Sequence, residues 1–261
     1  MPIAQLNSCR INYELQGQAN APALVLSNSL GSNFGMWDAQ MPALAKTYRV
    51  VRYDTRGHGQ SEVTPGPYTF EQLGRDVLAL ADSLNIDKFS FCGLSMGGVT
   101  GLWLALHAAK RLHKLVLCST GAKIGTADAW NARIEAVRKD GTKSIAAATM
   151  ERWFTAPFRE REPQTVERIQ NTLENTNTEG YIACCEALRD TDLREQVSSI
   201  SVPTLVISAT HDPAVPPSDG QFLAKQIPRA RYIELDAAHL ANMEQPNQFT
   251  EEVSHFLNSG M

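Results

Sequence analysis

The sequence predicts an α/β protein with a mostly parallel sheet and helices on both faces of that sheet. Short apolar runs of strand length alternate with stretches of helical length along most of the 261 residues. One such stretch, residues 70–84, carries apolar side chains three or four residues apart at Leu73, Val77, Leu80 and Leu84. Strands that alternate with helices favour parallel pairing, because each helix carries the chain back to the same edge of the sheet.

Six core strands are expected, each a short apolar run between polar or turn-forming residues. An earlier segment, residues 9–15, alternates apolar and polar side chains instead. That pattern predicts a half-exposed antiparallel strand at the sheet edge. The expected core strands are residues 23–27, 49–53, 88–92, 114–118, 204–208 and 231–235.

The alternation of strands and helices is interrupted between residues 121 and 193. This segment has few strand patterns and several helical ones, including a helix expected to begin near Thr126 or Asp128. We therefore expect one α/β core formed by residues 1–120 and 194–261. Residues 121–193 are expected to form a helical cap inserted into that core.

Composition and charge argue against several classes of protein. The chain is 43% hydrophobic and 20% charged, and its net charge is −4. Since it has no basic excess to neutralise phosphates, nucleic acid is not an expected partner. The N-terminus lacks the apolar core of a signal peptide, and no apolar run is long enough to span a bilayer, so a cytoplasmic protein is expected. The five irregularly spaced cysteines predict buried reduced thiols, and no metal-ligand spacing appears.

Ser95 is the candidate nucleophile. It is the central residue of Gly93-Leu94-Ser95-Met96-Gly97, between an expected strand and a helical pattern over residues 100–109. A sharp turn from strand to helix exposes the serine oxygen near the helix N-terminus, where N–H groups favour developing negative charge. The alternative is a serine that only happens to lie between two glycines.

A serine hydroxyl needs a base, and the base needs a group that orients it. Of the six histidines, His239 is the best candidate because it follows the last expected strand on a loop of small residues. Asp212 is the candidate acid, since it follows the strand before that one. An Asp-Pro pair after a strand is often only turn chemistry. Three such residues on three strand-end loops nevertheless favour nucleophilic catalysis jointly.

Two backbone N–H groups are expected to form an oxyanion hole. Met96 supplies one, because it follows the nucleophile directly. Leu30 is expected to supply the other, from the loop of residues 28–33 after the first core strand. An ordinary turn rich in Asn, Ser and Gly would explain that loop equally well.

The chain resembles the α/β-hydrolase superfamily along its whole length, and within it the 3-oxoadipate enol-lactonases. The segments RYDTRGHGQS and FCGLSMGG and the order Ser, Asp, His are typical of the superfamily. The segments LSNSLGSNFGMWD, GAKIG, ISATHDPAVPP and ELDAAHLANMEQP carry the narrower resemblance. The resemblance implies the roles already assigned to Ser95, Asp212, His239, Leu30 and Met96.

The resemblance also implies the reaction, which is hydrolysis of an anionic enol-lactone to 3-oxoadipate in the β-ketoadipate pathway of aromatic catabolism, without a cofactor or metal. Two alternatives remain open. One is a general carboxylesterase or cofactor-free perhydrolase that uses the same three residues. The other is a non-catalytic receptor for a small molecule. The oligomeric state is left open.

The cap is expected to recognise the carboxylate of the lactone. Between residues 121 and 190 the cap has nearly equal numbers of basic and acidic residues, so recognition would depend on a single placed cation. Arg133 is the candidate, since it lies three residues after Trp130 on the expected helix, at the border of its apolar face. Trp153 is expected to form an apolar wall beside the lactone ring. The alternative is that Arg133 is a solvated helix residue and Trp153 an ordinary core residue.

Overall fold

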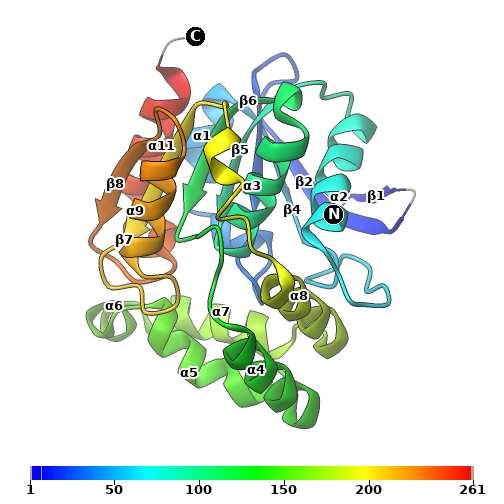
Figure 1. Cartoon of the computed structure of the whole chain (residues 1–261), viewed down its shortest axis with the longest axis vertical. Coiled ribbons are helices and arrows are strands. Elements are labelled where there is room, and N and C mark those ends of the chain that lie inside the picture. The colour runs from blue at the N-terminus through cyan, green and yellow to red at the C-terminus, as the bar shows by residue number, and fades with distance from the viewer. Residues whose placement is uncertain (1, 7, 260–261) are drawn as a thin grey trace.

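The computed structural model describes residues 2–6 and 8–259 (Figure 1). Their strands form one sheet in the order β1-β2-β4-β3-β5-β6-β7-β8. The strands from β4 to β8 in that order are parallel, whereas β1 and β2 pair antiparallel. The bounds are β1 (Ile3–Gln5), β2 (Arg10–Gln16), β3 (Ala23–Ser27), β4 (Arg49–Tyr53), β5 (Phe89–Leu94), β6 (Leu112–Cys118), β7 (Thr204–Ala209) and β8 (Arg231–Leu235).

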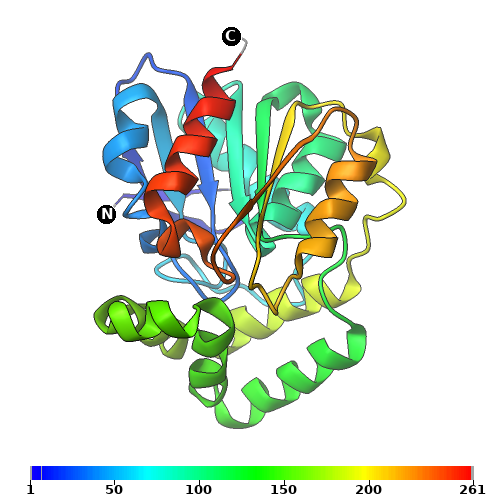
Figure 2. The same cartoon turned by 90° about the vertical axis from the view of Figure 1, so that its left-hand side faces the viewer.

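Helices cover both faces of the sheet, as the sequence predicts. Figure 2 shows α1 and α11 on one face and α3 and α9 on the other. Because the central strands β3 and β5 are covered on both sides, every residue in them is buried. The core helices are α1 (Met41–Thr47), α2 (Phe70–Ser83), α3 (Met96–His107), α9 (Pro217–Gln226), α10 (Ala241–Glu244) and α11 (Pro246–Asn258).

Two local expectations are wrong. The alternating strand β2 is not at the sheet edge, because β1 pairs outside it with Ile3 opposite Asn12. The turn expected across residues 93–97 is much tighter, since β5 ends at Leu94 and α3 begins at Met96. Only Ser95 therefore separates strand from helix, and the helix begins four residues earlier than its apolar pattern indicates.

Five helices are inserted between β6 and β7. Figures 1 and 2 show them gathered at the end of the molecule that faces away from the C-terminus. The insertion leaves and re-enters the core at one place, where the Leu193 N–H donates to the Ala122 carbonyl at 2.8 Å. We call these helices the cap: α4 (Ala127–Asp140), α5 (Lys143–Trp153), α6 (Ala156–Arg161), α7 (Pro163–Glu174) and α8 (Thr178–Asp190).

The first turn of α8 packs directly on the loop that follows β4. A Cβ atom added to Gly180 would lie 2.3 Å from the carbonyl oxygen of Gly57, so the two backbones touch with no room for a side chain. All five cysteines are buried and free of disulfides. None of the helices in the described part of the chain is long and apolar enough to cross a membrane.

Candidate active site

Ser95 lies in the strained turn between β5 and α3. Its φ of 57° and ψ of −116° are unfavourable for a residue with a side chain, and its N–H is held by the Cys118 carbonyl at 2.8 Å. Gly97 allows this turn to approach β3, since a Cβ there would lie 2.3 Å from the Ser27 carbonyl oxygen. The turn therefore presents the serine at the N-terminus of α3, at the carboxyl ends of the parallel strands.

Asp212 and His239 form a buried pair. His239 Nδ1 lies 2.7 Å from Asp212 Oδ2, and both side chains are almost fully removed from water. The other oxygen of Asp212 accepts from the backbone N–H groups of Ala214 and Val215 at 2.8 and 3.0 Å. These bonds fix the carboxylate, which in turn orients the imidazole so that Nε2 faces away from it.

Two contacts fix the surroundings of His239. The indole of Trp153 stacks beside the imidazole, with ring centroids 6.2 Å apart, and the Trp153 carbonyl accepts from the Leu240 N–H at 3.1 Å. Nε2 of His239 lies 3.5 Å from the hydroxyl of Ser29. Within the described residues no hydrogen bond joins Ser95 to His239, although both line the same chamber. Such bonds are often long in the absence of substrate.

The loop of residues 28–33, after β3, is held by hydrogen bonds that leave the Leu30 N–H free of described acceptors. The Gly31 N–H donates to Nε2 of His58 at 2.9 Å, and the Asn28 carbonyl accepts from the Gly97 N–H at 3.0 Å. The N–H groups of Leu30 and Met96 donate to no other described residue. They are thus available to bind the oxyanion that attack by Ser95 creates.

A chamber of about 470 Å³ lies between the cap and the strand ends. Ser95 and His239 line it from the core, and three predicted cap residues, Trp130, Arg133 and Trp153, line it from above. Tyr181 and Arg152 also line it, and the sequence analysis missed both. Their neighbours in the sequence carry no motif, and only the packing of cap helices brings them here.

Arg133 is held in place by other cap residues. Its Nε–H donates to the Tyr181 hydroxyl at 2.7 Å, and Nη2 donates to Thr149 Oγ1 at 3.1 Å. The guanidinium also lies over the Tyr181 ring, 5.6 Å from its centroid. One edge of the guanidinium is therefore occupied, whereas Nη1 and the second hydrogen of Nη2 remain for an anion.

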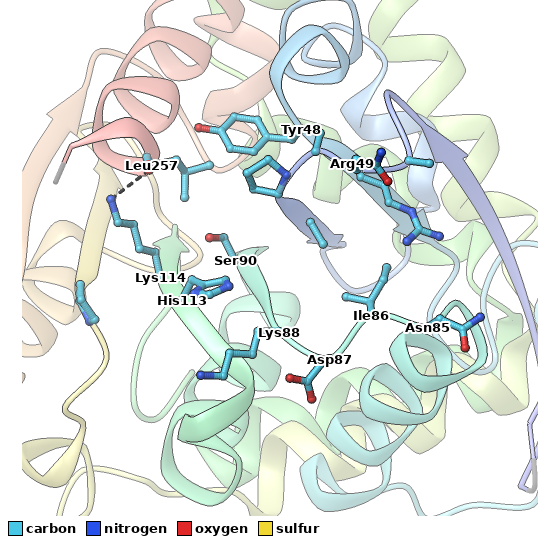
Figure 3. A pocket seen from close by; sticks show the side chains of 16 residues that line it. Tyr48, Arg49, Asn85, Ile86, Asp87, Lys88, Ser90, His113, Lys114 and Leu257 are labelled. Atoms are coloured by element: carbon cyan, nitrogen blue, oxygen red, sulfur yellow. Dashed lines mark hydrogen bonds between the residues drawn. The ribbon is translucent and has the colours of Figure 1, made fainter. Parts of the chain in front are cut away.

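A larger hollow of about 620 Å³ lies at the opposite, amino-terminal ends of the strands (Figure 3). Cationic side chains line this hollow. However, the ammonium of Lys114 already donates to the carbonyls of Phe256, Leu257 and Ser259 at the end of α11. Neither Ser95 nor His239 lines it. Catalysis by Ser95 and His239 is therefore expected in the smaller chamber, which both residues line.

Ser95, oriented His239 and free N–H groups around one chamber can together carry out acyl transfer, which is the chemistry of a serine hydrolase. Comparison with known families agrees with this class. The chain belongs to the alpha/beta hydrolase fold family, whose model matches residues 22–246.

Narrower similarity covers nearly the whole chain. The chain is 46% identical in sequence to 3-oxoadipate enol-lactonase 2 of Acinetobacter baylyi, and the match covers 93% of this chain and 91% of the relative. It is 44% identical to 3-oxoadipate enol-lactonase 1 of the same organism over 95% and 93%. The crystal structure of the enol-lactonase from Burkholderia xenovorans LB400 superimposes with a TM-score of 0.98 at 48% identity, covering 99% of this chain and all of that one.

Proposed function

We propose that the protein hydrolyses 3-oxoadipate enol-lactone to 3-oxoadipate, the activity after which its relatives in Acinetobacter are named. This would place it in the β-ketoadipate pathway of aromatic catabolism. The observation that carries the proposal is one chamber that joins Ser95 and His239 to the free edge of Arg133. The first two can cleave an ester, and the third can hold the carboxylate that distinguishes this lactone from simple esters.

The first half of the reaction opens the ring. Ser95 Oγ attacks the lactone carbonyl while Nε2 of His239 takes its proton, and Asp212 stabilises the imidazolium. The N–H groups of Leu30 and Met96 hold the oxyanion. When the carbon–oxygen bond of the ring breaks, its electron pair stays on the ring oxygen, which receives the proton from His239. The product is an acyl-serine with an enol that relaxes to a ketone.

The second half releases the acid. Water gives a proton to His239 and attacks the acyl-serine through the same oxyanion hole. Collapse of that intermediate breaks the bond to Ser95 Oγ, which regains its proton. An enol leaves more readily than an ordinary alkoxide, so the first half needs little acid assistance. All steps use residues of this chain and water.

The test is an assay of the purified protein on the enol-lactone, with ring opening followed by absorbance. Ser95→Ala should lower kcat by about 10⁴-fold or more with the fold intact. Ser29→Ala is the matched control, because it removes a serine hydroxyl that lies 3.5 Å from Nε2 of His239 but is not in a strained turn. It should keep activity within about tenfold of wild type, the scale of losing one neutral hydrogen bond.

Two results would contradict the proposal. A Ser95→Ala variant that kept more than about a tenth of wild-type turnover would rule out the acyl-serine. Turnover of simple aryl esters far faster than that of the lactone would instead favour a general carboxylesterase.

A further inference from the structure

A second arginine, Arg152, lines the chamber beside Arg133. It lies in the last turn of α5, next to Trp153, whose indole stacks on the imidazole of His239. Among the residues that the structure describes, no acceptor forms a hydrogen bond or ion pair with its guanidinium. Exposed Arg138 on α4, by contrast, pairs with Glu135. Arg152 lines the chamber while remaining exposed to water, and its donors are free of described acceptors.

The two guanidinium groups belong to one wall. Arg133, on α4, reaches across to α5 and donates to Thr149 Oγ1. Thr149 lies three residues before Arg152, so both are on the same face of that helix. Tyr181, from α8, accepts from Arg133 and closes the wall. Three cap helices thus bring two cations together at the chamber.

This pair of cations is not neutralised by the chamber itself. The residues that line the chamber include no aspartate or glutamate. Desolvation lowers the pKa of Arg152, and the charge of Arg133 lowers it further, whereas Tyr181 and Asp212 raise it. Like charges brought together disfavour each other, although water at the exposed Arg152 side chain weakens the repulsion. An anion between them would remove that repulsion.

We propose that Arg133 and Arg152 together bind one carboxylate, that of the anionic substrate. The inference deepens the proposed function and depends on it. Arg133, fixed by Tyr181 and Thr149, would present its remaining edge to the carboxylate in a set orientation. Arg152, which has no partner in the described chain, would close on the same carboxylate from α5. Selection of an acid over its neutral ester would then need both residues.

The experiment compares the lactone acid with its neutral methyl ester in wild type, Arg152→Ala, Arg133→Ala and the double variant. Each single substitution should lower kcat/KM for the acid about 10- to 100-fold, mostly through KM, the range for a charged hydrogen bond. The ester should lose less than about threefold. Because both residues hold one group, the double variant should lose less than the product of the two single losses.

Two further variants sharpen the comparison. Arg152→Lys keeps the charge without the planar fork and should recover most of the loss. Arg138→Ala removes an equal charge from α4 outside the chamber, and it should leave both substrates within about twofold of wild type.

The outcomes separate this inference from the proposed function. A wild type that fails to open the lactone contradicts the function itself. In an active wild type, equal losses on acid and ester in Arg152→Ala, or no loss on either, would overturn the role of Arg152. Fully multiplicative losses in the double variant would overturn the shared carboxylate.

Discussion

His58 holds the loop of residues 28–33, which carries the proposed oxyanion donor Leu30, although His58 itself has no role in the proposed reaction. It is fully buried, its Nε2 accepts from the Gly31 N–H, and its Nδ1 lies 3.3 Å from the Arg56 carbonyl. Nε2 can accept only in the neutral ring, so the proton belongs on Nδ1. Burial, partly opposed by the bond to Arg56, lowers the pKa of His58 to about 4.

That lowered pKa predicts a pH dependence of stability. Since an unfolded histidine titrates near about 6.5, the unfolded chain binds a proton between roughly pH 6.5 and 4 that the folded chain excludes. The free energy of unfolding should therefore fall on acidification through this window, by up to about 1.4 kcal/mol per pH unit from this group. Above the window the stabilisation is fully present.

Chemical denaturation at several pH values would measure this, with His58→Gln as the test variant. Gln can still accept from the Gly31 N–H but does not titrate, so its stability should depend less on pH between 4 and 6.5. The control is His255→Gln, at an exposed position on α11, which should keep the wild-type slope. A His58→Gln slope equal to wild type would show that His58 is not kept neutral by burial.

Sequence reasoning could place Ser95, Asp212 and His239 because each lies within four residues of the end of a core strand, and the carboxyl ends of parallel strands meet at one edge of the sheet. It could place Trp130 and Arg133 near each other because they share a helix face. It could not find Arg152 or Tyr181, since their position in the chamber depends on how α4, α5 and α8 pack against each other. No periodicity within one helix carries that information.

At the scale of elements, the accuracy of the predicted strand bounds did not follow burial: the partly exposed edge strand β8 was predicted to the residue, whereas the fully buried β5 and β7 end two and one residues beyond the expected ranges. β3, β4 and β8 begin and end where their residue pattern indicates. β1 was missed because three residues are too few to show a period. The start of α3 was missed because Gly97 and Gly98 are poor helix formers, and only tertiary contact with β3 favours helix there.

Glu244, in α10, links the cap to the loop of the catalytic base. One carboxylate oxygen accepts from the Thr155 N–H between α5 and α6, and the other accepts from the Ala238 N–H at 3.0 Å. Burial raises the pKa of this carboxyl, and the two N–H bonds oppose that shift. The element that follows His239 therefore holds both sides of the chamber together.

Glu244→Gln should lower the free energy of unfolding by about 1–3 kcal/mol, because the amide NH₂ would face one of two backbone donors and leave it unpaired. Denaturant titration would measure the loss, and hydrogen exchange should quicken at Thr155 or Ala238. Glu160→Gln, at an exposed position of α6, changes the charge equally and should stay within about 0.5 kcal/mol of wild type. If both variants were equally stable, Glu244 would not link the cap to the base loop.

At the scale of the whole molecule, the contact of Gly180 with Gly57 sets the distance between cap and core. Gly180→Ala should push α8 outward, because the added Cβ would lie 2.3 Å from a backbone oxygen. We expect a loss of about 1–3 kcal/mol in stability, typical of an overpacked site. We also expect a higher KM for the anionic lactone, since the next residue, Tyr181, holds Arg133.

Thermal unfolding and steady-state kinetics on the same samples would check both effects. Glu179→Ala, at the neighbouring exposed position of α8, is the control and should change neither quantity. Wild-type stability and KM in Gly180→Ala would mean that the two backbones are not held in contact.

The hydrogen bond between Leu193 and Ala122 joins the two ends of the cap, so the whole insertion could be exchanged as one cassette through two neighbouring junctions. Three of its other attachments also use backbone groups, namely the carbonyl of Trp153, the N–H of Thr155 and the chain at Gly180, whereas the Trp153 indole on His239 is a side-chain contact. A cassette from another family member could therefore be grafted at these two residues, provided that it keeps a glycine where Gly180 meets Gly57 and a side chain that fits beside His239. The grafted cap would then determine which substrate binds, while the loops at the strand ends of the core would still supply the residues for acyl transfer.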